Sequence, residues 1–360
     1  MIQHQQEAEQ TTFDLAGYLN RAASFLVRSV LHSAGLRYSL AFQRAANLRR
    51  KLEERGEHVP AFLIASITTR CNLFCAGCYA RAHEARFESP RETLSTERWS
   101  QLFLEARDCG ISFILLAGGE PFLRRDVLEA AGRVKGVLFP TFTNGTLLDD
   151  AALDLLARHR NLLPVLSLEG GRRETDGRRA NGTFDTLMKA MEALNRRALF
   201  FGLSLTVTTE NLSLLVSMEF QAELIEKGCR AVVFVEYVPV SSGTQSLAPT
   251  EQERGILEQE QSRLRTRYPD VLFLSFPGDE KESGGCLAAG RGFFHISATG
   301  SAEPCPFSPY SDTSLRELPL RQALNSPLFR YLNSGMLASE HTGGCVLVDK
   351  EDQVKAFFNR

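Results

Sequence analysis

The sequence predicts an α/β protein built around an open, partial (β/α)6 barrel of the TIM-like kind. Between residues 62 and 235, short apolar segments alternate with longer segments of helical periodicity, in six strand-then-helix units. The apolar segments are almost continuous, which is typical of parallel strands buried on both faces. Right-handed connections curl such a sheet toward a barrel, and six units are too few to close an eight-stranded one.

Composition and charge narrow the class of protein. The apolar fraction of 43% supports a sizeable core, and the formal net charge of −2 gives no reason to expect nucleic acid as a partner. Eight cysteines in 360 residues do not indicate a secreted disulfide scaffold, and reduced thiols or metal ligands predict a reducing, cytoplasmic setting. We find no secretory signal pattern and no apolar run of the roughly 20 residues that a membrane-spanning helix needs.

The N-terminal region is predicted to be helical and basic. Residues 1–12 are polar and predict a disordered tail, whereas residues 13–58 predict amphipathic helices that Gly35 divides. Apolar residues follow the helical spacing at Leu15, Leu19, Ala22, Leu26 and Val30. Seven basic and no acidic residues lie between Leu15 and Leu52. We favour a helical cap with solvated arginines. The alternative is peripheral binding, through residues 13–55, to the inner face of a membrane or to an acidic partner.

The barrel region is predicted to span residues 59–240. Its predicted strands are residues 62–67, 112–117, 137–142, 164–168, 199–208 and 231–235. Its predicted helices are residues 96–109, 124–134, 149–159, 184–195 and 213–227. Ser95 or Thr96 is the predicted N-cap of the first helix and Gly110 its terminator. Residues 241–280 predict a linker with a charged helix and a strand-like segment, and residues 281–360, rich in Gly, Pro and Cys, predict a small metal-organised appendage.

Three cysteines follow the first predicted strand. Cys71, Cys75 and Cys78 have the spacing C-x3-C-x2-C, which places three thiolates on one short loop. A [4Fe–4S] cluster normally has four cysteine ligands, so this loop would leave one iron open to an outside ligand. A zinc loop or a set of buried thiols is the alternative, although zinc sites prefer paired C-x2-C units that supply four ligands.

The other polar motifs of the barrel region also follow predicted strands. They are Gly118-Gly119-Glu120-Pro121, Thr143-Asn144-Gly145, Ser167-Leu168-Glu169-Gly170, Thr206 with Thr208, and Glu236-Tyr237-Val238-Pro239. Functional groups of a (β/α) barrel gather at the carboxyl ends of its strands. These motifs are therefore expected to meet the cysteine loop at one rim.

The cysteine loop and the Gly-Gly-Glu-Pro segment together resemble the radical SAM superfamily. The resemblance implies that S-adenosylmethionine (SAM) chelates the open iron and that Gly118, Gly119, Glu120 and Pro121 bind its methionine amine. Gly77 departs from the family pattern, in which an aromatic residue often precedes the third cysteine.

The resemblance implies further SAM-binding residues at the same rim. Ser167 and Glu169 match positions that face the ribose and sulfonium. Asn144 and Thr206 join the expected cofactor-binding set. Either Arg178 or Arg179 could clamp the SAM carboxylate, with a solvated loop arginine as the alternative. Tyr237 and Val238 fall where the family packs adenine, and core packing is the alternative.

The remaining cysteines fall into two groups. Cys109 and Cys229 are predicted to be structural. Cys286 and Cys305, with Gly300 between them, resemble the opening of the SPASM and twitch domains, and Cys345 is the one cysteine that follows. The resemblance implies a twitch-like domain over residues 281–360 with a second, auxiliary [4Fe–4S] cluster held by these three cysteines. Asp349, water or substrate could complete that cluster. A hairpin without a cluster is the alternative.

The resemblance also implies the reaction. An external one-electron donor of the flavodoxin or ferredoxin type reduces the first cluster. SAM is then cleaved to a 5′-deoxyadenosyl radical, which takes hydrogen from a peptide, protein, tetrapyrrole or lipid substrate. The sequence assigns no catalytic acid or base, because each of the polar candidates can equally be structural. These candidates are Asp279, Glu280, Tyr237 and His295. A non-enzymatic iron–sulfur or zinc protein is the competing class.

Overall fold

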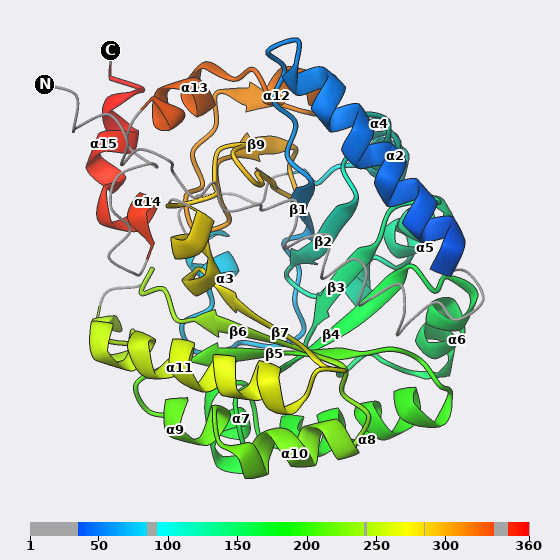
Figure 1. The fold of residues 1–360 in the computed structure, drawn as a ribbon, viewed down its shortest axis with the longest axis vertical. Helices are drawn as coiled ribbons and strands as arrows, with labels where there is room; N and C mark the ends of the chain where they lie inside the picture. The colour runs from blue at the N-terminus through cyan, green and yellow to red at the C-terminus, as the bar shows by residue number, and fades with distance from the viewer. Residues whose placement is uncertain (1–34, 85–91, 241–242, 284, 335–344, 360) are drawn as a thin grey trace, which may run out of the picture.

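The computed structural model describes residues 35–84, 92–240, 243–283, 285–334 and 345–359. The predicted tail at residues 1–12 and the first part of the predicted helical region lie outside the described residues. The strands of the described chain form a single ten-stranded sheet in the order β10-β9-β8-β1-β2-β3-β4-β5-β6-β7. Figure 1 shows this sheet curling around a central space, with helices on its outer side.

Seven consecutive strands of this sheet are parallel and build the barrel. They are β1 (Phe62–Thr68), β2 (Phe113–Gly118), β3 (Phe139–Thr143), β4 (Leu162–Leu168), β5 (Gly202–Val207), β6 (Ala231–Glu236) and β7 (Leu272–Phe276). The predicted partial barrel is confirmed, but it has seven parallel strands and not the six that the sequence predicted. The strand-like segment assigned to a linker is β7, which pairs in parallel with β6, Ala231 opposite Leu272.

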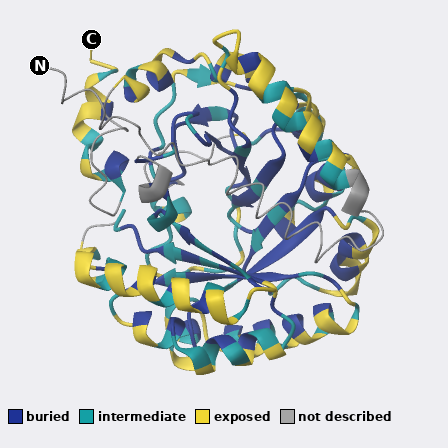
Figure 2. Cartoon of the chain, viewed as in Figure 1, coloured by how far each residue is buried: buried dark blue, intermediate teal, exposed yellow. Residues whose placement is uncertain are grey.

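The helices cover the convex side of the sheet with their apolar faces turned inward (Figure 2). They are α4 (Thr96–Asp108), α5 (Arg125–Arg133), α6 (Asp150–Arg158), α8 (Thr183–Arg196), α9 (Leu212–Leu215), α10 (Met218–Glu226) and α11 (Glu251–Arg267). Ser95 caps α4 as expected, because its side chain accepts a hydrogen bond from the Arg98 amide. The helix predicted over residues 213–227 is two helices, since the Ser217 side chain caps a new start by accepting from the Phe220 amide.

Helix α2 (Gly35–Glu53) packs across the amino ends of the first strands. Its Phe42 ring stacks on Phe113 at 5.3 Å and also contacts Leu138 and Leu163. Arg49 donates hydrogen bonds to the Gly110 carbonyl and the Ser112 hydroxyl. This arrangement is that of a helical cap, and binding of the basic region to a membrane or an acidic partner stays a prediction. In the part of the chain that the structure describes, no helix is long and apolar enough to span a membrane.

The C-terminal region extends the same sheet beyond β1. Strand β9 (Ser301–Glu303) is antiparallel to both β8 (His295–Ile296) and β10 (Thr313–Ser314), while β8 pairs in parallel with β1. The helices of this region are α12 (Leu320–Ala323), α13 (Pro327–Asn333), α14 (Val346–Asp349) and α15 (Glu351–Ala356). The Phe293 ring lies 5.4 Å from Phe62 on β1 and 5.8 Å from Phe276 on β7, so it bridges the two edge strands of the barrel.

Short helical segments complete the loops. They are α3 (Tyr79–Glu84), α7 (Arg172–Arg178), η1 (Pro121–Leu123), η2 (Gln245–Leu247) and η3 (Gly278–Ser283). Helix α3 begins directly after Cys78, and α7 ends at Arg178 beside the cysteine loop. Both positions matter for the site, and neither helix is long enough to show as a periodic pattern in the sequence.

Candidate active site at the carboxyl rim of the barrel

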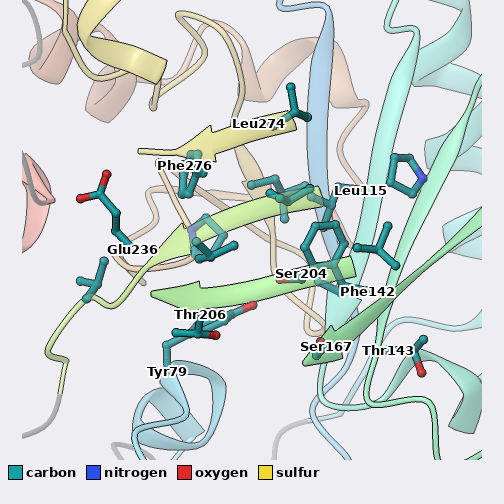
Figure 3. A pocket seen from close by; sticks show the side chains of 18 of the residues that line it. Tyr79, Leu115, Phe142, Thr143, Ser167, Ser204, Thr206, Glu236, Leu274 and Phe276 are labelled. Carbon is teal, nitrogen blue, oxygen red and sulfur yellow. The ribbon is translucent and has the colours of Figure 1, made fainter. Parts of the chain in front are cut away.

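The interior of the barrel holds a cavity of about 440 Å³. Side chains from strands β1 to β7 line it. Figure 3 shows three of these lining residues, Leu115 on β2, Phe142 on β3 and Phe276 on β7. A volume of this size, with mostly apolar walls and a few polar groups, is typical of a small-molecule site. The polar groups gather at the carboxyl rim, where the three cysteines of the loop also line the cavity.

The cysteine loop is held from two sides. The Ala76 amide donates to the Arg178 carbonyl at 2.9 Å, and Arg178 Nε donates back to the Ala76 carbonyl at 3.2 Å. Asn144 Nδ2 donates to Cys71 Sγ at 3.9 Å, and Arg179 Nη1 donates to Cys75 Sγ at 3.8 Å. Partial burial raises the pKa of both thiols, and the Arg179 charge opposes the rise at Cys75. The loop therefore already has donors aimed at its sulfur atoms.

The glycine pair after β2 lies against the start of the cysteine loop. The Gly119 amide donates to the Thr68 carbonyl at 2.7 Å, and the Glu120 amide donates to the Arg70 carbonyl at 2.8 Å. A Cβ atom on Gly119 would lie 2.0 Å from the Arg70 carbonyl oxygen, and Gly118 has a φ of +121°. Only glycine permits this approach of two backbones.

Glu120 joins the β2 turn to the β3 turn. Its carboxylate accepts hydrogen bonds from the Phe122 amide at 3.0 Å, the Thr143 hydroxyl at 2.7 Å and the Asn144 amide at 2.8 Å. Burial raises its pKa, and these hydrogen bonds oppose the rise. Gly118, Gly119 and Asn144 line the cavity. Glu120 and Pro121 are not among its lining residues.

Glu169 is the centre of a buried charge group between β4 and α7. Its Oε1 accepts from Arg178 Nη1 at 2.7 Å and from Arg179 Nε at 2.9 Å, and Arg178 also donates to the Thr206 hydroxyl at 2.8 Å. Burial by itself would lower the pKa of Arg179, but Glu169 together with Cys75 and Cys78 more than offsets it, and the pKa is raised. Glu169 Oε2 is buried without a hydrogen-bond partner in the described chain. Ser167 and Thr206 line the adjoining cavity wall.

Tyr237 explains why the sequence has glycine before the third cysteine. A Cβ atom on Gly77 would lie 2.2 Å from Tyr237 Oη, so the tyrosine occupies the space that a side chain there would need. Within the described residues Tyr237 Oη has no hydrogen-bond partner, and the Arg178 guanidinium lies 6.0 Å from the ring centroid. Val238 lines the same part of the cavity.

A second group of cysteines lies beside the barrel cavity. Cys286, Cys305 and Cys345 line one small cavity, and Glu280 lines it together with them. Burial raises the pKa of Cys286 and Cys305 well above the ordinary value and that of Cys345 to about 12. Burial likewise raises the pKa of Glu280 to about 8. The structure thus brings together three cysteines that span 59 positions of the chain and adds a carboxyl group to them.

The two cysteine groups fit clusters better than single ions. In the described part of the chain, no three His, Cys, Asp or Glu side chains are placed to hold one metal ion. A zinc ion draws its ligands to within about 2.3 Å of one point, whereas a cube takes each thiolate on a different iron. Three thiols around one cavity, with buried and unpartnered carboxylate oxygens beside each group, are a donor set suited to a cluster.

The other polar residues considered from the sequence have structural partners. His295 contacts Glu303 at 2.8 Å and Ser66 at 2.7 Å, and all three are buried. Asp279 accepts hydrogen bonds from the Ser275 amide and from Arg265. Cys229 donates to the Ala231 carbonyl, and Cys109 packs against the core.

Comparison with known proteins identifies the family. A model of the radical SAM superfamily matches residues 65–220, which contain the cysteine loop and the glycine pair. The matched region of the chain is a radical SAM domain. The chain is 27% identical over 305 residues to the AdoMet-dependent heme synthase of Methanosarcina barkeri, covering 76% of this chain and 85% of the relative. Fe-coproporphyrin III synthase of the same organism is 34% identical over 152 residues, 41% of this chain and 37% of the relative.

Solved structures show the same fold. SuiB from Streptococcus suis, in its complex with the precursor peptide SuiA, superposes with a TM-score of 0.68 at 18% identity, covering 86% of this chain and 77% of SuiB. The antiparallel C-terminal region is like that of SPASM-domain enzymes. This radical SAM protein is therefore an enzyme, and its family implies a [4Fe–4S] cluster and SAM. The alternative of a non-enzymatic scaffold is set aside.

Most of the predicted site residues meet at one place. Those that line the barrel cavity are Cys71, Cys75, Cys78, Gly118, Gly119, Asn144, Ser167, Arg178, Thr206 and Tyr237. Three further predicted residues do not line this cavity: Glu120, Pro121 and Glu169. The second group consists of Cys286, Cys305 and Cys345. Sequence reasoning did not separate Arg179 from Arg178, because two adjacent arginines give the same signal. It also did not place Glu280 with the tail cysteines.

Proposed function

We propose that this radical SAM enzyme reductively cleaves SAM and removes a hydrogen atom from a substrate held in the barrel. A [4Fe–4S] cluster and SAM, when bound, supply one-electron cleavage of the sulfonium to a 5′-deoxyadenosyl radical. The observation that carries the proposal is that Cys71, Cys75 and Cys78 and the Gly118-Gly119 turn face one cavity from the same rim. The protein binds and orients both groups and keeps water away from them.

In this proposal, different rim residues bind different parts of SAM. The carbonyls of Gly118 and Gly119 accept hydrogen bonds from the methionine amine, and Glu120 holds that turn in place through Thr143 and Asn144. The unpartnered Oε2 of Glu169 is an acceptor for the ribose hydroxyls.

The basic and aromatic residues of the rim complete this binding set. Tyr237 packs the adenine against Val238. Arg178 and Arg179 supply positive charge near the SAM carboxylate, although both already bind Glu169.

The cavity walls favour a substrate that presents an apolar part to the radical. Below the rim the lining consists mostly of apolar side chains, among them Phe62, Phe113, Leu163 and Phe200 at its floor. The relatives named for heme and Fe-coproporphyrin III synthesis lead us to propose a tetrapyrrole-like small molecule first. A peptide is the second candidate, because the SuiB structure of the same fold contains a precursor peptide.

We also propose that Cys286, Cys305 and Cys345 hold the auxiliary [4Fe–4S] cluster and that a flavodoxin- or ferredoxin-type protein reduces the rim cluster. Support for the auxiliary site comes from the shared cavity of the three thiols and from its position against the barrel cavity, with which it shares Phe276, Phe293 and Phe307 as wall residues. The Tyr79 ring lies 5.2 Å from Phe307, so one aromatic pair connects the residue after Cys78 with the residue two positions after Cys305.

SAM cleavage tests the proposed function directly. Anaerobically reconstituted enzyme should form 5′-deoxyadenosine from SAM with dithionite, and Cys75→Ala should form none. Cys109→Ala is the matched control, because Cys109 lines neither cavity and should keep the activity. Formation of 5′-deoxyadenosine by Cys75→Ala would show that the rim assignment is wrong. With deuterated porphyrins or peptides, transfer of deuterium into 5′-deoxyadenosine would identify the substrate class.

A further inference from the structure

Glu280 is a buried carboxyl group that accepts hydrogen bonds from the Leu287 amide and the Cys286 thiol through one oxygen only. It lies in η3, directly after β7, and is only 4% exposed. Its Oε1 has no hydrogen-bond partner among the described residues. An ionised carboxylate is costly to bury unless a positive charge or a metal compensates it. A group placed in this way points to a ligand.

The surroundings of Glu280 contain three thiols and otherwise apolar side chains. Cys286, Cys305 and Cys345 line the small cavity that Glu280 enters, and each of the three interacts electrostatically with the carboxyl group. The rest of the lining is Val238, Phe276, Pro277, Phe293, Phe307 and Val346. The charges that act on Glu280 are those of Arg291, whose guanidinium donates to the Cys286 carbonyl at 2.6 Å, and of Glu236. Three sulfur donors and one oxygen donor therefore face the same small space.

We propose that Glu280 is the fourth ligand of the auxiliary cluster and binds the iron that the three cysteines leave open. This inference rests on the proposed auxiliary cluster. Asp349, the ligand considered from the sequence, is exposed at the end of α14, so it is the less suitable carboxylate. A carboxylate at this corner closes the cluster, because all four irons then have a protein ligand. The auxiliary cluster would consequently not bind substrate directly through iron, in contrast to the rim cluster.

The experiment isolates the auxiliary site in the full-length chain. Cys71, Cys75 and Cys78 are replaced by Ala, and this parent is reconstituted anaerobically with iron and sulfide. Glu280→Gln, Glu280→Cys and Asp349→Asn are then compared in that background by iron content, Mössbauer spectroscopy and EPR after mild oxidation. These readouts do not depend on turnover. Glu280→Gln keeps the shape of the side chain, and Glu280→Cys supplies a fourth thiolate.

The expected results separate the inference from the proposed cluster. The parent, Glu280→Cys and Asp349→Asn should each hold about four irons per chain. Glu280→Gln should lose one iron on oxidation and give a [3Fe–4S] signal. A parent without iron would refute the auxiliary cluster itself. Glu280→Gln spectra identical to those of the parent, or a three-iron cluster in Asp349→Asn, would overturn the assignment of Glu280 while the cluster stands.

One outcome needs the cysteine variant to decide it. If Glu280→Gln binds no iron at all, the substitution has either removed a ligand or disturbed the fold of the region. A four-iron cluster in Glu280→Cys then supports ligation, because thiolate at the same position restores the site. Failure of Glu280→Cys to bind iron in that case overturns the proposal.

Discussion

The two cysteine groups of this enzyme have the same ligand count and opposite environments. Cys71, Cys75 and Cys78 are partly exposed on a loop at the rim, with Arg179 donating to one sulfur atom. Cys286 and Cys305 are 6% and 3% exposed and lie among aromatic side chains. In the proposed scheme, the number of cysteines therefore does not determine what the open iron of each cluster binds. We propose that access to the barrel cavity and the neighbouring charged groups determine it.

Charge separates the two groups as clearly as exposure does. The rim group has a buried carboxylate, Glu169, that two arginines neutralise, and the charges of these arginines act on Cys75. The tail group instead has the buried Glu280 carboxyl, whose Oε1 has no hydrogen-bond partner in the described chain. In the proposed scheme the rim iron stays open for SAM, and the tail cluster is closed by the protein.

The largest effect is expected from Gly119→Ala. The added methyl group would meet the Arg70 carbonyl oxygen at 2.0 Å, and the three nearest atoms all belong to the Thr69–Arg70 backbone, which cannot move aside as a flexible side chain could. We expect loss of SAM cleavage to background and loss of the rim iron, while the tail iron remains. Gly177→Ala is the matched control, since its Cβ would meet nothing within 4 Å. Equal loss of iron from both sites in Gly119→Ala would mean that the two groups are not independent.

Glu169→Ala is expected to have the next largest effect. It leaves Arg179, whose side chain is 9% exposed, buried without its partner, which costs about 3–5 kcal/mol. Urea denaturation followed by circular dichroism measures this loss. Arg173→Ala breaks the neighbouring Arg173–Glu174 pair, in which the arginine is 89% exposed, and should leave the midpoint unchanged. Similar urea midpoints for both variants would show that the rim charges are solvated. The proposed difference in charge between the rim and tail cysteine groups would then be wrong.

Iron removal should distinguish the two groups by rate. Chelation by EDTA with mild oxidation needs access to the cluster, and two of the three tail thiols, Cys286 and Cys305, are buried and become accessible only by local opening. We expect two phases of iron loss that differ by at least about tenfold in rate, the faster one from the rim. The Cys71, Cys75 and Cys78 triple Ala variant should lack the fast phase. A single phase in the wild type would contradict the difference in burial.

The rim site was largely predictable from the sequence because its signals are local. The C-x3-C-x2-C loop and the glycine pair each need only a few adjacent residues, and the apolar strands identify the rim on which they meet. The distant residue that each of these local motifs contacts was not predictable in the same way. Gly77 is required by Tyr237, 160 positions later, and no local pattern relates them. Arg178 and Arg179 differ in their contacts only in the folded structure, where the Arg179 guanidinium lies against Cys75.

The tail and the end of the barrel show the same limit. Strand β7 follows a long polar helix and shows alternating burial, so its pairing with β6 depends on tertiary packing. Glu280 meets Cys305 and Cys345 only because η3 packs against the β8–β9 hairpin and α14. A polar residue in a short turn has no periodicity that would reveal such a partner.

The smallest expected effect concerns the outer side of the rim loop. Phe74 is 75% exposed, and the Arg81 guanidinium lies 3.6 Å from its ring centroid, with the exposed Arg70 on the same loop. The tail group has no comparable surface among the described residues, since the aromatic side chains around it are buried or partly buried. A basic and apolar surface beside the rim cysteines suits an acidic electron-donor protein.

Arg81→Gln should therefore slow reduction by an acidic flavodoxin about two- to threefold at low salt. High salt should remove the difference, because it screens exposed charges. The measured quantity is the ratio of 5′-deoxyadenosine formation with flavodoxin to that with dithionite, which cancels any effect of lost support from Arg81 to the Leu73 carbonyl. Arg196→Gln, on the outer helix α8, is the control and should not change the ratio. An unchanged ratio for Arg81→Gln would mean that the electron donor binds at another surface. The exposed rim loop would then be explained by SAM binding alone.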